Sequence, residues 1–278
     1  MESVVERASP EASGSPEGGE PQPRWPAWYG GVAFVVALVA TLVAVGLVAA
    51  ATGTTPDDES PTFTIVATFL QDAIFVATAV LFASFVLRPR PGHFGLRATR
   101  LWPAVRLAGL GLLSFYGFSA LYAVALHPDV DQRITQDLGA NTGTLGLIVA
   151  GVMVICVAPA AEEFFFRGFF YKALRSRFRV VPAAVIDGIV FGVIHYDFSA
   201  ADALLVVPPL AVLGFIFCLV YEQTGSLYPV IALHAINNSV AYAIQADGGA
   251  VSAVLGPLVV VACMVVPWLA PRPAATLR

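Results

Sequence analysis

Two glutamates and an arginine stand inside one of the most apolar stretches of this sequence. The segment 159–168 reads PAAEEFFFRG and holds Glu162, Glu163 and Arg167. Glu163 and Arg167 are four residues apart, so they share one face of a helix and can form an ion pair. Glu162 points about 100° away on such a helix and has no local partner. Desolvation in an apolar setting disfavours a carboxylate charge and makes the group a better proton acceptor, which favours Glu162 as a general base.

Two further motifs supply imidazole and amide groups. FGVIH contains Phe191 and His195, and HAINN contains His234 and Asn238, and the members of each pair are four positions apart. A single histidine in an apolar helix is more often a packed core residue than a ligand. Two histidines in separate apolar segments, together with Glu162, favour a shared site. Such groups can activate a water molecule directly or bind zinc through three protein ligands, and both alternatives stay open.

The composition is typical of a polytopic membrane protein. Hydrophobic residues make up 58% of the 278-residue chain and charged residues only 12%, against about 25% charged residues in soluble domains. A membrane-spanning helix needs about 20 apolar residues. We therefore predict an all-α polytopic membrane protein, a conical bundle of about eight transmembrane helices with an active-site cavity inside the membrane. The predicted spans are 28–52, 62–87, 101–126, 144–171, 182–196, 203–221, 228–245 and 251–270.

The charges of the loops predict how the chain is oriented. The loops 88–100 and 172–180 are rich in arginine, whereas the loops 53–61 and 127–142 are mainly acidic. Loops rich in Lys and Arg stay on the cytosolic side. The pattern therefore predicts a multi-pass protein of the cell membrane with both termini in the cytosol. No strongly basic face is present, so nucleic acid is not an expected partner.

Three regions are predicted along the chain. Residues 1–26 are rich in Glu, Pro, Ser and Gly, which predicts a disordered cytosolic tail. Residues 27–271 are predicted to form a single transmembrane domain, followed by a short cytosolic tail at 272–278.

The three motifs, in this order on separate spans, resemble the CPBP intramembrane protease family. The stretch TGSLYPVIALHAINNSVAYA around the third motif adds to the resemblance, which covers about residues 144–245. The family includes CAAX prenyl endopeptidases of the Rce1 type and bacterial abortive-infection and bacteriocin-immunity proteins. The resemblance implies an endopeptidase, surrounded by membrane lipid, that hydrolyses a peptide bond of a membrane-attached protein or peptide. Prenylated CaaX tails are among the implied substrates.

The motif match also implies roles for individual residues. Glu162 would activate a water, with His195 sharing its proton. His234 and Asn238 would stabilise the oxyanion that forms when water attacks the peptide carbonyl. Three residues would support this set, the ion pair by holding the glutamate helix and the phenylalanine by packing: Glu163, Arg167 and Phe191.

The resemblance leaves the cofactor undecided, because the family has been described both as metalloproteases and as glutamate-dependent proteases. Glu162, His195 and His234 are the candidate zinc ligands. The HExxH arrangement of soluble zinc proteases is absent from the sequence. Because an amide such as that of Asn238 suits an oxyanion better than zinc, the sequence favours a metal-free glutamate and histidine mechanism.

Two other functions compete with proteolysis as readings of these polar residues. The first is a catalytically silent immunity or interaction protein on the same scaffold. The second is a proton- or ion-coupled transporter, which the concentration of polar residues in the second half of the chain disfavours. Two intramembrane aspartates stay without an assigned role. Asp187 could support the site or pair with a loop arginine, and Asp72 has no identified partner.

Overall fold

The computed structural model describes residues 23–55, 60–126, 134–196 and 203–269. Most of the predicted N-terminal tail, the C-terminal tail and most acidic residues of the loops 53–61 and 127–142 lie outside these residues. The described part is helical throughout and contains no strand. The all-α polytopic prediction is confirmed.

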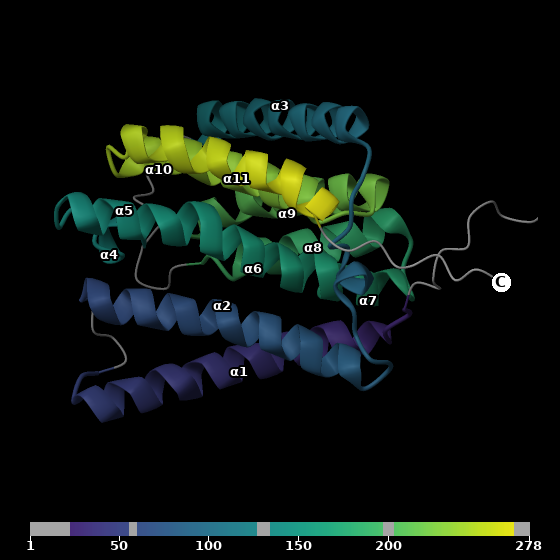
Figure 1. Ribbon diagram of the computed structural model, residues 1–278, viewed down its shortest axis with the longest axis horizontal. Helices are drawn as coiled ribbons and strands as arrows, with labels where there is room; N and C mark the ends of the chain where they lie inside the picture. Colours follow the sequence, from purple (N-terminus) through teal and green to yellow (C-terminus); the bar gives the residue numbers. More distant parts are fainter. Residues whose placement is uncertain (1–22, 56–59, 127–133, 197–202, 270–278) are drawn as a thin grey trace, which may run out of the picture.

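The helices are laid side by side along the long axis of the molecule (Figure 1). Seven form continuous rods: α1 (Ala27–Thr52), α2 (Pro61–Ser84), α3 (Leu101–Leu126), α8 (Val180–Val193), α9 (Val207–Thr224), α10 (Tyr228–Gln245) and α11 (Gly249–Leu269). One further rod joins α5 (Thr144–Val152), α6 (Ala158–Phe165) and α7 (Lys172–Arg175) through the π-helical segments η2 (Met153–Val157) and η3 (Phe166–Tyr171). Short elements are η1 (Pro91–Phe94), α4 (Ile134–Asp137) and η4 (Ala203–Val206).

Six of the predicted spans are long and apolar enough to cross a membrane, as judged by length and composition within the described residues. They are Ala27–Thr52, Pro61–Ser84, Leu101–Leu126, Thr144–Arg175, Leu204–Thr224 and Gly249–Leu269. The predicted span 182–196 corresponds to α8, which is apolar but shorter. The span 228–245 corresponds to α10, which is not among these six. Its polar side chains His234, Asn237 and Asn238 lower its hydropathy. The conical shape and the internal cavity stay predictions.

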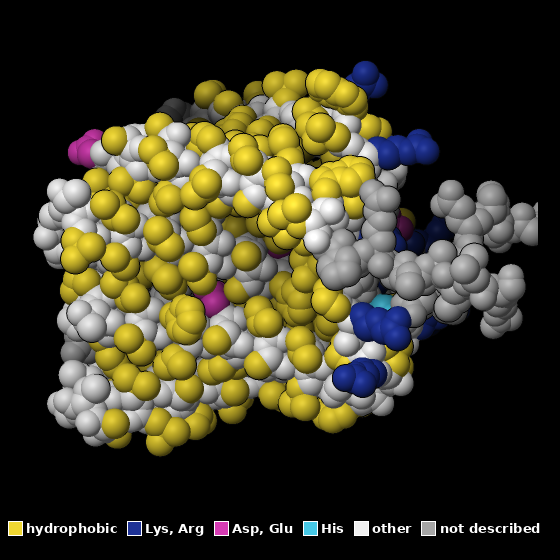
Figure 2. Space-filling model, viewed as in Figure 1, with side chains coloured by type: hydrophobic (Ala, Val, Ile, Leu, Met, Phe, Trp, Pro, Cys, Tyr) yellow, Lys and Arg dark blue, Asp and Glu magenta, His cyan; other side chains and the backbone are white. Residues whose placement is uncertain are grey.

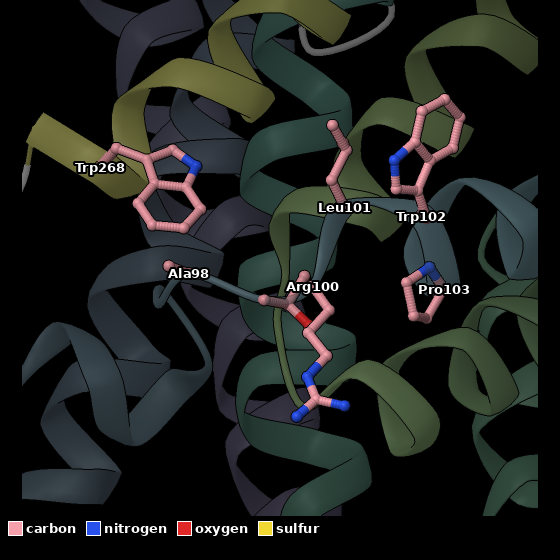
Figure 3. A pocket seen from close by; sticks show the side chains of 7 residues that line it. Ala98, Arg100, Leu101, Trp102, Pro103 and Trp268 are labelled. Carbon is pink, nitrogen blue, oxygen red and sulfur yellow. The ribbon is translucent and has the colours of Figure 1, made fainter.

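One end of the bundle collects the basic side chains. The segments that follow α2, α7 and α9 lie at this end, together with the start of α1 and the end of α11 (Figure 1). Lys and Arg side chains gather there, while hydrophobic side chains cover the length of the helices (Figure 2). An open apolar pocket between α3 and α11 also lies there, lined by Leu101, Trp102 and Trp268 with Arg100 beside them (Figure 3). Tryptophan and arginine are typical of a membrane–water interface.

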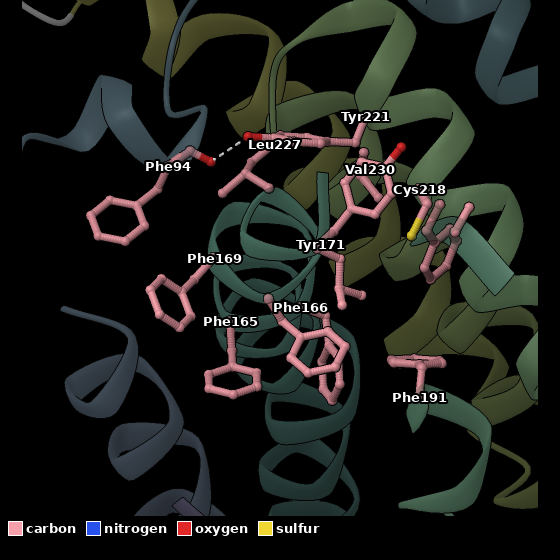
Figure 4. Close-up of a cluster of buried hydrophobic side chains, with 14 of the residues drawn as sticks. Phe94, Phe165, Phe166, Phe169, Tyr171, Phe191, Cys218, Tyr221, Leu227 and Val230 are labelled. Atoms are coloured by element: carbon pink, nitrogen blue, oxygen red, sulfur yellow. Dashed lines mark hydrogen bonds between the residues drawn. The ribbon is translucent and has the colours of Figure 1, made fainter. Parts of the chain in front are cut away.

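Aromatic side chains from the rod 144–175 form the centre of the hydrophobic core (Figure 4). Phe165, Phe166 and Phe169 are fully buried. The Trp25 ring is also buried, with its centroid 5.1 Å from that of Phe169 and 5.3 Å from that of Phe94. Trp25 falls inside the predicted disordered tail, so packed structure begins before α1 does. The reason is the size of the indole ring, which buries a large apolar area by itself.

Two glycines bring α8 and α9 into close contact. A Cβ atom at Gly188 would lie 2.5 Å from the carbonyl oxygen of Ala211, and one at Gly192 would lie 2.7 Å from that of Val207. Glycines four residues apart let membrane helices approach until their backbones touch. This contact sets the position of Phe191, which lies between the two glycines, and of His195, which follows the end of α8 at Val193.

We expect Gly188→Ala to lower the stability of the protein by about 1–3 kcal/mol, because the added methyl group meets backbone atoms that cannot rotate away. Thermal unfolding in detergent micelles measures the effect. The matched control is Gly117→Ala in α3, where an added Cβ meets nothing within 4 Å. An equal melting temperature for both variants would contradict the proposed role of the α8–α9 contact.

Candidate active site

The buried guanidinium of Arg167 contacts residues from three parts of the bundle. Arg167 Nη1 donates to Glu163 Oε1 at 3.0 Å, and both side chains are fully buried, so the predicted ion pair is present. Arg167 Nη2 donates to the carbonyl oxygen of Gly214 in α9 at 2.9 Å and lies 3.4 Å from Asp187 Oδ1 in α8. The guanidinium carbon also lies 4.5 Å from the centroid of the Phe191 ring. Such a cation is stable inside the bundle because carboxylates and an aromatic face surround it.

The surroundings of Arg167 explain three residues that sequence reasoning left open or missed, namely Asp187, Cys218 and Gly214. Of the two alternatives for Asp187, the structure supports the one inside the bundle. Its carboxylate also accepts a hydrogen bond from Cys218 Sγ at 3.1 Å. Gly214 was not singled out, although a Cβ atom there would lie only 3.0 Å from Arg167 Nη2. No local pattern marks either Cys218 or Gly214, because their partner is far away in the sequence.

His234 lies between the two adjacent glutamates. Its Nδ1 is 2.8 Å from Glu163 Oε1, and its Nε2 is 3.9 Å from Glu162 Oε2. Glu163 accepts from the Arg167 guanidinium through the same oxygen, which shows that its carboxylate is the acceptor and His234 Nδ1 the donor. Glu162 has a side chain that is 12% exposed, and its buried Oε2 has no hydrogen-bond partner. The two glutamates therefore differ as predicted from their helix positions.

His195 follows the end of α8 and contacts Phe191. Its Nδ1 lies 2.7 Å from the carbonyl oxygen of Phe191. A carbonyl oxygen only accepts, so Nδ1 carries the hydrogen and Nε2 keeps its lone pair in the neutral ring. The Phe191 ring is 4.8 Å from the His195 ring and 5.8 Å from the His234 ring, measured between centroids. Phe191 thus packs against both imidazoles, while the rest of His195 is exposed.

A proline explains how Asn238 is held. The N–H of Ala158 bonds to the carbonyl oxygen of Met153 in the π-helical register of η2. The next donor in this register would come from residue 159, but Pro159 has no N–H. The carbonyl oxygen of Val154 is therefore left for Asn238 Nδ2, which donates to it at 2.9 Å. One amide hydrogen of Asn238 remains available, and π-helical segments are frequent at functional sites.

The candidate zinc ligands do not form a zinc centre as the structure places them. Within the four described segments, no group of three His, Cys, Asp or Glu side chains is arranged to hold a metal ion. Glu162 and His234 face each other, but a structural or catalytic zinc site needs three or four protein ligands around one point. These residues, as placed, do not fit a zinc ion.

We expect Glu163→Gln to lower the turnover of an active enzyme by on the order of 10²-fold, because His234 Nδ1 would lose its carboxylate acceptor. The ¹⁵N chemical shifts of His234 would report the changed hydrogen bond directly. Glu222→Gln, which alters a carboxylate bound to Arg175, is the matched control. Unchanged His234 shifts and unchanged turnover in Glu163→Gln would contradict the role given to this contact.

Comparison with known proteins identifies the segment that carries the site. Residues 144–240 match the family model described as type II CAAX prenyl endopeptidase Rce1-like. The matched range contains Glu162, Glu163, His195, His234 and Asn238. Searches of curated proteins and of solved structures give no match. Residues 144–240 of this membrane protein are therefore an Rce1-like domain of the CPBP family, a family of CAAX-type intramembrane proteases.

Proposed function

We propose that this protein is an intramembrane endopeptidase that hydrolyses a peptide bond of a membrane-attached protein, with prenylated CaaX-type tails as the favoured substrate class. The observation that carries the proposal is the pairing of Glu162 and His234. An acceptor oxygen without a hydrogen-bond partner lies 3.9 Å from an imidazole nitrogen, inside a bundle of apolar helices. One water molecule can bind both groups across such a distance.

Glu162 acts as the general base in the first step. The carboxylate takes a proton from the water while the water oxygen forms a bond to the peptide carbonyl carbon. The electrons of the carbonyl double bond move to its oxygen, which becomes an oxyanion. His195 shares this proton with Glu162. It can accept the proton at Nε2, which keeps a lone pair because Nδ1 is bound to the Phe191 carbonyl.

His234 and Asn238 stabilise the oxyanion. They are one helical turn apart on α10, and Asn238 has one amide hydrogen available beyond the one bound to Val154. His234 Nδ1 already donates to Glu163, so Nε2 donates only when the ring holds its second proton. The role of His234 therefore requires an imidazolium. Preorganised donors of this kind are worth roughly 3 kcal/mol each in the transition state.

The second step breaks the peptide bond. The oxyanion returns its electrons to the carbon, the carbon–nitrogen bond breaks, and the leaving nitrogen takes the proton from Glu162. Glu162 is then a carboxylate again and the products are a carboxylic acid and an amine. Arg167, Glu163 and Asp187 keep α6, α8 and α10 in place during these steps through their buried contacts.

The arrangement in the membrane is part of the proposal. The basic end of the bundle, where α1 starts and α11 ends, is assigned to the cytosol because Lys and Arg are retained there. Residues 27–271 act as a single transmembrane domain around the protease core at about 144–245. The terminal tails at 1–26 and 272–278 are assigned to the same side.

New C-termini in membrane proteins test the proposed function. Cells that express the wild-type protein or Glu162→Gln at equal levels are compared by quantitative mass spectrometry of membrane-protein C-termini. We expect a set of cleaved C-termini that is present with the wild type and absent with Glu162→Gln. Identical sets would refute proteolysis and leave a catalytically silent interaction protein.

A further inference from the structure

The amide of Asn238 is held by more than its contact with Val154. Its Nδ2 donates to the Val154 carbonyl oxygen at 2.9 Å, and its Oδ1 accepts a hydrogen bond from Nδ2 of the neighbouring Asn237 at 3.3 Å. Oδ1 of Asn237 in turn accepts from the Tyr116 hydroxyl at 3.4 Å. These four residues form an amide chain that connects α3 to η2 through two adjacent asparagines of α10. Tyr116 lies outside the segment that matches the Rce1-like family.

The Val154 carbonyl fixes the direction of every bond in the amide chain. A carbonyl oxygen only accepts, so the Asn238 atom that faces it is the NH2 nitrogen. The other end of this amide is then an oxygen, which requires the NH2 nitrogen of Asn237 as its donor. The remaining Asn237 atom is an oxygen, so the Tyr116 hydroxyl donates to it. A reversed Asn238 amide would set oxygen against oxygen at one contact and NH2 against NH2 at the other.

The packing of α3 against α10 brings Tyr116 to Asn237. A Cβ atom at Gly111 of α3 would lie 3.0 Å from Ile216 Cγ2 and 3.4 Å from Leu233 Cδ2, so α3 lies close to both α9 and α10 at this level. Leu233 and Asn237 are four residues apart and share one face of α10. Tyr116 follows Gly111 by five residues on α3, which lies beside α10 at one edge of the bundle (Figure 1).

The position of Tyr116 in its helix explains why its hydroxyl needs a partner inside the protein. α3 is one of the helices that are long and apolar enough to cross a membrane, and Tyr116 is exposed on it. Fifteen residues of helix, about 22 Å, separate Tyr116 from the start of α3 at Leu101. A polar group at such a depth in lipid has no water to bind, and hydrogen bonds between helices replace the water.

We propose that Tyr116 and Asn237 are positioning residues that act through Asn238. An asparagine amide with one contact can turn about its Cβ–Cγ bond, whereas contacts at both ends fix its plane. The amide chain supplies both contacts and leaves one N–H of Asn238 for the oxyanion. A donor that is already oriented costs no reorganisation at the moment of reaction. This inference rests on the proposed function, in which Asn238 binds the oxyanion.

Nuclear magnetic resonance in lipid nanodiscs tests the amide chain without any substrate. The sequence contains three asparagines, Asn141, Asn237 and Asn238, so protein labelled with ¹⁵N only in asparagine gives three pairs of side-chain amide signals. We expect Tyr116→Phe to move the signals of Asn237 and Asn238 and to leave those of Asn141 in place. Asn238 signals that stay unchanged in Tyr116→Phe overturn the proposal.

Tyr122→Phe is the matched control for this experiment. Tyr122 lies on the same helix, and its hydroxyl donates to the Leu205 carbonyl oxygen at 3.0 Å, so the substitution also removes one hydrogen bond from an α3 tyrosine. It should leave the Asn238 signals and kcat unchanged. Equal movement of the Asn238 signals in Tyr122→Phe and Tyr116→Phe would indicate a general effect of α3 and would overturn the proposal.

Kinetics test whether the amide chain acts on catalysis. Tyr116→Phe should lower kcat about fivefold with little change in KM, which corresponds to one hydrogen bond between neutral groups. In Asn238→Ala the amide that Tyr116 positions is gone, so adding Tyr116→Phe should lower kcat no further. A merely structural role of Tyr116 would lower kcat by the same factor in both backgrounds. That result, or a wild-type kcat in Tyr116→Phe, overturns the proposal.

The two proposals fail in different ways. If Glu162→Gln and Asn238→Ala keep full proteolysis, the proposed function fails, whatever the amide signals show. If both variants lose most of their proteolysis but Tyr116→Phe keeps the wild-type kcat and amide signals, only the positioning role fails. If Tyr116→Phe does not fold, Asn237→Ala, which removes the next residue of the amide chain, takes its place in both experiments.

Discussion

Glu162→Gln is expected to lower kcat for cleavage of a membrane-attached substrate by on the order of 10³-fold, within the range typical of a lost general base. Glutamine has nearly the same shape as glutamate but cannot accept the proton from water. Glu162 makes no hydrogen bond through its buried Oε2, so the substitution breaks none of the contacts of that atom. The rate of cleavage in reconstituted liposomes measures the effect.

Two controls separate catalysis from folding in this experiment. Glu222→Gln changes another glutamate of the same domain, which is bound to Arg175 and Tyr171 at the basic end, and should keep turnover near the wild-type value. The melting temperature of Glu162→Gln in detergent should stay within a few degrees of the wild type. If Glu162→Gln cleaves at a rate within threefold of the wild type, the assignment of Glu162 as the base is wrong.

Arg167→Met is expected to destabilise the protein by about 3–5 kcal/mol, the cost of leaving buried charges without their partner. The substitution removes the cation that binds Glu163 at 3.0 Å and lies 3.4 Å from Asp187, all three being fully buried. It also removes the donor to the Gly214 carbonyl, which ties the glutamate rod to α9. The free energy of unfolding in mixed micelles, from titration with a denaturing detergent, measures the loss.

The ion pair of Arg175 and Glu222 provides a matched control. Its nitrogen and oxygen are 2.8 Å apart, but the two side chains are 30% and 26% exposed. Solvent screens such a pair, so Arg175→Met should cost no more than about 1 kcal/mol. A similar loss of stability for both variants would mean that burial does not make the contacts of Arg167 contribute more to the free energy of unfolding than the exposed pair does.

Local periodicity explains which features could be predicted from the sequence. The apolar runs predicted the helices, because a run of about 20 apolar residues is long enough to cross a membrane as a helix. The spacing of Glu163 and Arg167 predicted their ion pair, because residues four apart always meet on a helix. The order of the three motifs predicted the family, which the match over residues 144–240 confirms.

The contacts between helices could not be predicted in the same way. Glu163 and His234 are 71 residues apart, and their hydrogen bond depends on how α6 and α10 are rotated toward each other. The partner of Asn238 is a backbone carbonyl that Pro159 leaves free, which becomes visible only when the π-helical register is known. Periodicity fixes the face of each residue on its own helix but not the helix that covers this face.

The tertiary structure therefore decided which polar groups meet. The close α8–α9 approach at Gly188 and Gly192 and the stacking of Phe75 on Phe165 set the rotation and register of the neighbouring helices. These contacts place Asp187 beside Arg167. The sequence by itself determined the helices and their reactive side chains. Packing of glycines and aromatic rings, which acts between distant segments, determined the partners of those side chains.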